Sequence, residues 1–194
     1  MELLTNLLHI AVPLRSRTKS MVLGVLCIAL IPGLAAAVEP LEYAVKAAFL
    51  SKFGLYVEWS STAFSSPSSA INLCVVGEDP FGATLDTAVR GQRIGGREVV
   101  IRRLKTIGRE SGCHILYIGG VETQHSSQII AAVRGGSVLT VTDAHEPEAA
   151  VGIINFVIKD NRVRFDIDEQ AAAQNGLTIS SKLLSLALNV KPRH

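Results

Sequence analysis

The feature that most constrains the fold is the alternation of helical patterns with short apolar runs along residues 41–189. Apolar residues recur at helical spacing in the first segment, and the short apolar runs that follow it are typical of buried strands. We expect strands at residues 71–76, 99–101, 114–118, 138–141, 151–158 and 163–167. Helices are expected at residues 41–57, 82–90, 122–133, 168–175 and 181–189. This order predicts an α/β fold: a mainly parallel sheet flanked by helices in three layers, of flavodoxin-like tendency, ending in a β-hairpin and a helix.

The first 37 residues have the pattern of a secretory signal peptide. Three basic residues precede an uncharged apolar run at residues 21–34, and three alanines, Ala35 to Ala37, follow it. We expect cleavage after Ala37, which leaves residues 38–194 as a single periplasmic domain; the alternative is an uncleaved membrane anchor. The removed segment carries the whole formal excess of +2, so the exported chain has no charge that favours nucleic acid as a partner.

Two cysteines, Cys74 and Cys113, remain in the exported chain. An even number of cysteines in an oxidising compartment favours a disulfide, and the alternative is a pair of buried thiols. On the chain-entropy model, a bridge that closes about 40 residues stabilises a fold by roughly 4 kcal/mol. The two cysteines can meet if the first and third parallel strands are neighbours, as in a flavodoxin-like strand order.

Glycines and one acidic residue follow several expected strands and form a candidate ligand site. Gly77 and Gly82 flank the turn after the first strand, Gly119 follows the third strand, and Asp143 follows the fourth. Because open α/β sheets bind small molecules at the carboxyl edge of their strands, this pattern is compatible with a small anionic or amino-acid-like ligand. The competing interpretation is that tight turns require glycine. The turn also lacks the lysine of a phosphate-binding P-loop.

The sequence contains no recognisable catalytic or metal-binding constellation. Its histidines have no ligand spacing relative to one another or to cysteine, and no G-x-S-x-G nucleophile motif occurs. Ser180 and Ser181, which precede Lys182, are interpreted as a helix N-cap rather than as a nucleophile. We therefore expect no enzyme, no cofactor and no metal.

Seven motifs, in order, resemble the YfiR family of periplasmic proteins. The resemblance covers residues 42–187, nearly the whole exported chain. The motifs are EYAVKAAFL at 42–50, LCVVGEDPFG at 73–82, GCHIL at 112–116, LTVTD at 139–143, INF at 154–156, RVRFDI at 162–167 and ISSKLL at 179–184.

The resemblance implies a regulator rather than an enzyme. YfiR-like proteins bind the periplasmic sensor part of a YfiN-type inner-membrane diguanylate cyclase and hold it inactive. A YfiB-type outer-membrane lipoprotein can sequester the repressor, after which cyclic di-GMP rises and promotes biofilm formation. The resemblance also implies that Cys74 and Cys113 are the family's disulfide pair.

Partner contacts are expected in the C-terminal region, by the same resemblance. The candidate partner-binding residues are Ile154, Phe156, Asp166 and Asp168. Phe49, Phe53 and Trp59 could either pack on the sheet or mediate a homodimer. Two functions stay open: a periplasmic repressor of a membrane cyclase, and a periplasmic domain that senses a small ligand, either a nucleotide or an amino acid.

Overall fold

The computed structural model describes residues 38–144 and 150–193, with side chains from residue 41 onward. The expected signal peptide and its cleavage site after Ala37 lie outside the described residues. None of the described helices has the length and apolar character needed to cross a membrane.

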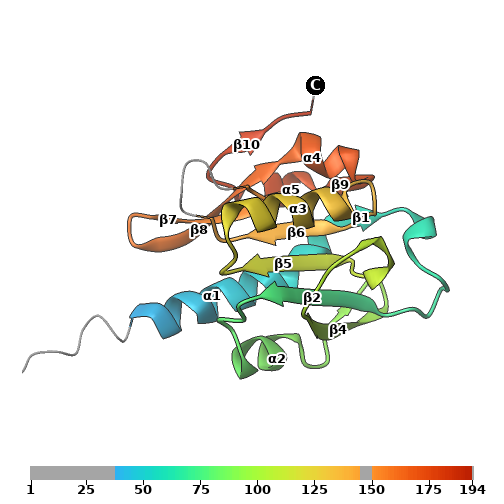
Figure 1. Ribbon diagram of the computed structural model, residues 1–194, viewed down its shortest axis with the longest axis horizontal. Coiled ribbons are helices and arrows are strands. Elements are labelled where there is room, and N and C mark those ends of the chain that lie inside the picture. Colours follow the sequence, from blue (N-terminus) through green and yellow to red (C-terminus); the bar gives the residue numbers. More distant parts are fainter. Residues whose placement is uncertain (1–37, 145–149, 194) are drawn as a thin grey trace, which may run out of the picture. The chain divides into compact units, whose positions relative to one another are not determined.

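An eight-stranded sheet with the order β10-β8-β7-β6-β5-β2-β4-β3 forms the centre of the fold (Figure 1). The strands are β2 (Ile71–Gly77), β3 (Arg93–Ile94), β4 (Arg97–Leu104), β5 (Ile115–Gly119), β6 (Leu139–Thr142), β7 (Ile154–Lys159), β8 (Arg162–Asp168) and β10 (Val190–Lys191). A separate antiparallel pair joins β1 (Val57–Trp59) to β9 (Leu177–Ile179).

The sheet is mixed, so the expectation of a mainly parallel, flavodoxin-like sheet is wrong in this respect. The pairs β7–β8 and β3–β4 run antiparallel, whereas the other neighbours in the sheet are parallel. The cause is local, because a two-residue turn joins the strands of each antiparallel pair. Parallel strands cannot be joined by so short a connection. Asp160 and Asn161 form the β7–β8 turn with φ of +50° and +56°, typical of a type I′ hairpin, and this hairpin was expected.

Helices cover both faces of the sheet, because successive side chains of each strand point to opposite sides. They are α1 (Val38–Phe53), α2 (Ala83–Val89), α3 (Thr123–Val133), α4 (Glu169–Gln174) and α5 (Ser181–Leu184). On one face, Leu73 and Val75 of β2 share a core with residues of α1, α2, α4 and α5. On the other face, Cys74 and Val76 pack with residues of α3.

Four phenylalanines join α1 to the β7–β8 hairpin. Phe49 and Phe53 of α1 lie against Phe156 and Phe165, with ring centroids between 5.2 and 6.5 Å apart. Trp59 donates its indole N–H to the carbonyl oxygen of Ser137 at 2.9 Å. These aromatic side chains therefore pack within the chain, as one of the two interpretations predicted.

The first helix ends earlier than its apolar pattern predicts. Gly54 is buried, and a Cβ built on it would lie 2.6 Å from Ile94 Cδ1, so a larger residue there would require the Ile94 side chain to shift. The turn η1 (Gly54–Tyr56) then leads into β1, which pairs with β9. The last helix also ends early, at Leu184 instead of Asn189, because Leu188 N–H bonds to the Phe165 carbonyl along β8.

Candidate functional site

The carboxyl edge of the sheet brings together three of the four residues expected there. Gly77 and Gly119 are paired in register at the ends of β2 and β5, and Asp143 follows β6 directly. The backbones approach closely, because Glu78 N–H donates to the Gly119 carbonyl at 2.9 Å. Close backbone packing is therefore sufficient to explain Gly77 and Gly119.

Replacing Gly77 with alanine is expected to lower the free energy of unfolding by about 2–3 kcal/mol. Gly77 has a φ of +82°, and an added Cβ would lie 2.0 Å from the Gly119 carbonyl oxygen. Gly135→Ala is the matched control, because Gly135 has a φ of +73° and nothing within 4 Å of an added Cβ. Urea denaturation should show a clearly larger loss for Gly77→Ala. Equal losses would mean that backbone conformation, and not the contact with Gly119, requires glycine.

The turn at Gly82 is filled by the chain's own carboxylate. Asp79 Oδ1 accepts the backbone N–H groups of Phe81 at 2.9 Å and Gly82 at 3.2 Å, and Arg103 Nε donates to Asp79 Oδ2 at 2.6 Å. Burial raises the pKa of Asp79, but the bonds from Arg103, Phe81 and Gly82 outweigh it and lower the pKa overall. The amide groups that a phosphate would use are thus already bonded, which argues against an anion at Gly82.

A buried lysine anchors α1 to this edge of the sheet. The Lys46 side chain is 0% exposed, and its ammonium group donates to Glu42 and, at 2.5 Å, to Asp143 Oδ2. The same group lies 4.8 Å from the centroid of the Tyr43 ring. A buried charge is tolerated only when it is paired, so this arrangement fixes α1 relative to the end of β6.

Lys46 was not identified from the sequence as a site residue, although a signal for it exists. Tyr43, Lys46, Leu50 and Phe53 follow one another at the spacing of a single helix face. Lys46 therefore interrupts an otherwise apolar stripe. The position of its partner could not be predicted, because Asp143 lies 97 residues away in the sequence.

A cleft of about 520 Å³ lies between the N-terminal turn of α3 and the end of β6. Its lining includes Glu122, Thr123, Thr142 and Asp143. Of the four residues expected to form a ligand site, Asp143 lines this cleft, but Gly77, Gly82 and Gly119 do not. In the part of the chain that the structure describes, no three His, Cys, Asp or Glu residues are grouped so that they could hold a metal ion.

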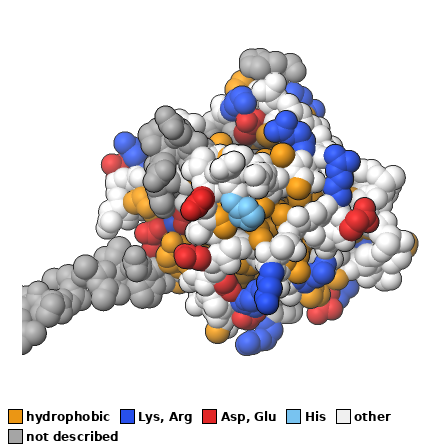
Figure 2. Space-filling view, in the orientation of Figure 1, with side chains coloured by type: hydrophobic (Ala, Val, Ile, Leu, Met, Phe, Trp, Pro, Cys, Tyr) orange, Lys and Arg blue, Asp and Glu red, His pale blue; other side chains and the backbone are white. Residues whose placement is uncertain are grey.

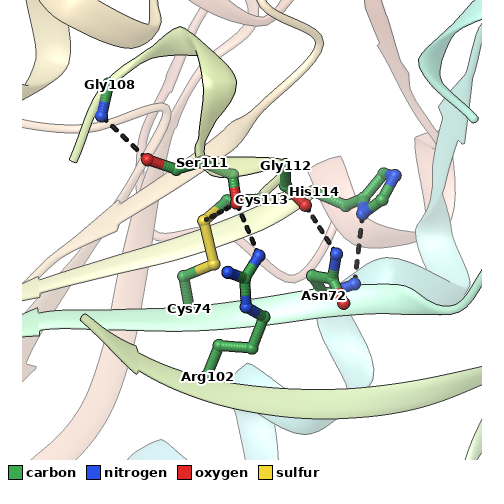
Figure 3. Close-up of a disulfide and its surroundings, with 8 residues drawn as sticks. All are labelled: Asn72, Cys74, Arg102, Gly108, Ser111, Gly112, Cys113 and His114. Carbon is green, nitrogen blue, oxygen red and sulfur yellow. Dashed lines mark hydrogen bonds between the residues drawn. A yellow bond between two sulfur atoms is a disulfide. The ribbon is translucent and has the colours of Figure 1, made fainter.

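Cys74 and Cys113 form a disulfide between β2 and the residues before β5, with their Cα atoms 5.8 Å apart (Figure 3). The first and third parallel strands are indeed neighbours, which is what allows the two cysteines to meet. The segment before β5 is also held by side chains from β2 and β4. Asn72 Nδ2 donates to the Gly112 carbonyl at 2.7 Å, and Arg102 donates to the Ser111 carbonyl at 2.5 Å (Figure 3).

Two of the four residues expected to bind a partner belong to the core. Ile154 and Phe156 are 0% exposed, so the expectation that they contact a partner is not compatible with this structure. The physical reason is that β7 lies between β6 and β8 and that its first three residues, 154–156, are buried, whereas the strand becomes exposed toward Lys159. Asp166 and Asp168 are partly exposed. Asp166 accepts from Asn189 N–H at 3.0 Å, and Asp168 caps α4 by accepting from Ala171 N–H at 2.8 Å.

Charged side chains of both signs are interspersed over the face that Figure 2 shows. The mixed sheet, the helices on both of its faces and the internal disulfide define the protein as an α/β domain stabilised by a disulfide.

Residues 43–188 match the family model described as YfiR/HmsC-like, and the chain belongs to this family. Membership indicates a regulatory domain of the periplasm that takes part in cyclic di-GMP signalling.

Proposed function

We propose that the protein is a periplasmic repressor of an inner-membrane diguanylate cyclase. It binds the periplasmic sensor part of a YfiN-type cyclase, holds it in an inactive state and so lowers cyclic di-GMP and biofilm formation. A YfiB-type outer-membrane lipoprotein relieves the repression by sequestering it. The observation that carries this proposal is the family match over residues 43–188. The disulfide supports it, because stable bridges belong to oxidising compartments such as the periplasm.

The repressor acts by binding the inactive state of the cyclase more tightly than the active state. Such differential affinity shifts the population of the cyclase without any chemical step. No catalytic group is required of the repressor itself.

The surface that we assign to the cyclase runs along β8 and the C-terminal tail. We define this C-terminal surface as Asp166, Leu186, Leu188 and Val190. The three apolar side chains are 53%, 38% and 37% exposed, respectively. The tail is held in place by backbone bonds from Leu188 to Phe165 and by the pairing of Val190 with Ile167. Exposed apolar groups with a polar neighbour are typical of contact surfaces between proteins.

Leu186→Glu is expected to weaken binding of the purified sensor domain at least about tenfold, the equivalent of about 1.4 kcal/mol. The change places a charge where an apolar side chain would be desolvated on binding. Val100→Glu is the control, because Val100 is 38% exposed and lies on β4, which four strands separate from β8 in the sheet. Isothermal titration calorimetry should show nearly unchanged affinity for the control. Equal affinities for both variants and the parent chain would remove the tail from the interface.

The cleft beside Asp143 favours a second candidate function, the sensing of a small ligand. Glu122 gives its lining an acidic side chain, whereas the charge of Asp143 is paired with Lys46. Acidic side chains attract an ammonium group and repel phosphate, so an amino acid is a better candidate than a nucleotide. Because a bound ligand raises the apparent stability, thermal shift measurements with single amino acids test this function. A lack of any shift at millimolar ligand would contradict it.

A further inference from the structure

His114 connects the start of β2 to a serine-rich segment, residues 60–70, which we call the serine loop. The histidine is buried, with 7% of its surface exposed. Its Nδ1 accepts the backbone N–H of Asn72 at 3.1 Å (Figure 3), and its Nε2 lies 3.2 Å from the carbonyl oxygen of Ala63 in the loop. Because Nδ1 is the acceptor, the ring is the neutral tautomer that carries its proton on Nε2 and donates it to Ala63.

Besides the bond from His114 to Ala63, the serine loop is held on the sheet by the ring of Phe64 and by two hydrogen bonds from Arg97. Phe64 stacks on His114 with ring centroids 4.7 Å apart, and Arg97 of β4 lies 3.7 Å from the Phe64 ring. Arg97 also donates to the carbonyl oxygens of Ser66 at 2.9 Å and Ser69 at 2.8 Å. The loop therefore depends on His114 and Arg97 together.

Protonation of His114 is incompatible with this arrangement. An imidazolium ion carries a proton on both nitrogens, so Nδ1–H would face the N–H of Asn72, donor against donor. Leaving that buried N–H without its acceptor costs about 1–3 kcal/mol. A desolvated imidazolium could gain about 2 kcal/mol by stacking on Phe64, but burial and the positive charge of Arg97 also oppose the protonated ring. The loss exceeds the gain.

The surroundings of His114 contain one charged group that acts on it. Burial lowers the pKa of His114 below its ordinary 6.5, the bond to Ala63 opposes this effect, and the positive charge of Arg97 adds to it. The neighbours on the other sides do not titrate. They are Asn72 of β2, Phe64 of the serine loop and Leu139 of β6, whose N–H bonds to the His114 carbonyl.

We propose that the protein senses acid through His114, whose protonation releases the serine loop and opens the apolar groove beside it. The groove has a volume of about 270 Å³ and is lined by residues that include Trp59, Phe64, Ile71 and Ile94. Phe64 is the part of this lining that the loop contributes. This function goes beyond repression of a cyclase and does not depend on it.

The direction of the pH effect follows from the geometry. The folded state favours neutral His114, so its stabilising contribution is complete above the unfolded pKa of 6.5 and declines as the pH falls below it. Loop closure should weaken over the same range. An exported protein meets such a range whenever its surroundings become acidic, and histidine is the side chain suited to detect it.

The chain supplies its own reporter, since it contains a single tryptophan, Trp59, which lines the groove. Tryptophan emission of the full chain should shift to longer wavelength between about pH 8 and about pH 5 as water enters the groove. Over the same range, the amides of residues 60–70 should exchange at least about tenfold faster after correction for the intrinsic pH dependence. Amides of β5 should not change.

His114→Asn removes the titration while its Oδ1 can still accept from Asn72, so both signals should become independent of pH. His125→Asn is the matched control, because His125 is an exposed histidine on α3, and it should keep the parent behaviour. A transition that persists in His114→Asn would overturn the proposal. If that variant does not fold, the ring protons of His114 are titrated by NMR in the parent chain. Titration of the ring without a coincident change in the loop would equally overturn the proposal.

Discussion

Replacing both Cys74 and Cys113 with alanine should lower the free energy of unfolding by about 4 kcal/mol. The two residues are 39 positions apart, and the bridge restricts the unfolded chain over that whole loop. The loss would be a large fraction of the roughly 5–15 kcal/mol that stabilises a typical domain. Alanine is preferred to serine because Cys74 is 0% exposed, and a buried hydroxyl would add a cost of its own.

Urea denaturation with and without a reductant isolates the contribution of the bridge. The parent chain should lose a similar stability when the reductant is added, whereas the double alanine variant should not respond to it. A titration of thiols in the unfolded, unreduced parent should detect neither Cys74 nor Cys113. A parent chain that is equally stable with and without reductant would contradict the account of the fold.

Lys46→Met should destabilise the fold by about 3–5 kcal/mol, the typical cost of removing one partner of a buried ion pair. Methionine fills similar space but leaves the Asp143 carboxylate buried without the ammonium group that lies 2.5 Å from it. Lys52→Met is the matched control, because Lys52 is an exposed lysine near the end of the same helix. The free energy of unfolding of Lys52→Met should remain within about 0.5 kcal/mol of the parent value.

The double variant Lys46→Met/Asp143→Leu separates the loss of charge pairing from the loss of packing. The double variant removes both buried charges, and Glu42, whose side chain is 22% exposed, keeps contact with water, so most of the stability should be recovered. Thermal and urea denaturation of the two single variants, the double variant and the parent chain complete the cycle. A double variant as unstable as the sum of the two single variants would show that Lys46 and Asp143 contribute independently.

The local patterns in the sequence identified the main strands and helices because each is long enough to show its own periodicity. The short elements were missed, since β1, β9 and β10 have two or three residues and depend on partners far along the chain. The β3–β4 hairpin had a readable signal. Gly95 and Gly96 lie between its strands with φ of +56° and +80°, and a pair of glycines is a common hairpin turn.

The candidate site was only partly predictable, because its contacts also join residues that lie far apart in the sequence. The disulfide was expected because two cysteines remained and their strands could be neighbours, which the pairing of β2 with β5 allows. The assignment of Ile154 and Phe156 to a partner contact came from the resemblance, although their alternation with Asn155 is typical of a strand with one face on the core. The contact of Asp79 with the amides before α2 depends on the local backbone conformation, which the residue pattern does not specify.

The measurement that tests the central claim most directly is cellular cyclic di-GMP after deletion of the gene. The proposed repressor predicts a rise that the intact gene reverses, and that a gene carrying Leu186→Glu reverses only in part. A gene carrying Val100→Glu should reverse it fully. An unchanged level of cyclic di-GMP in the deletion strain, over several growth conditions, would contradict the account.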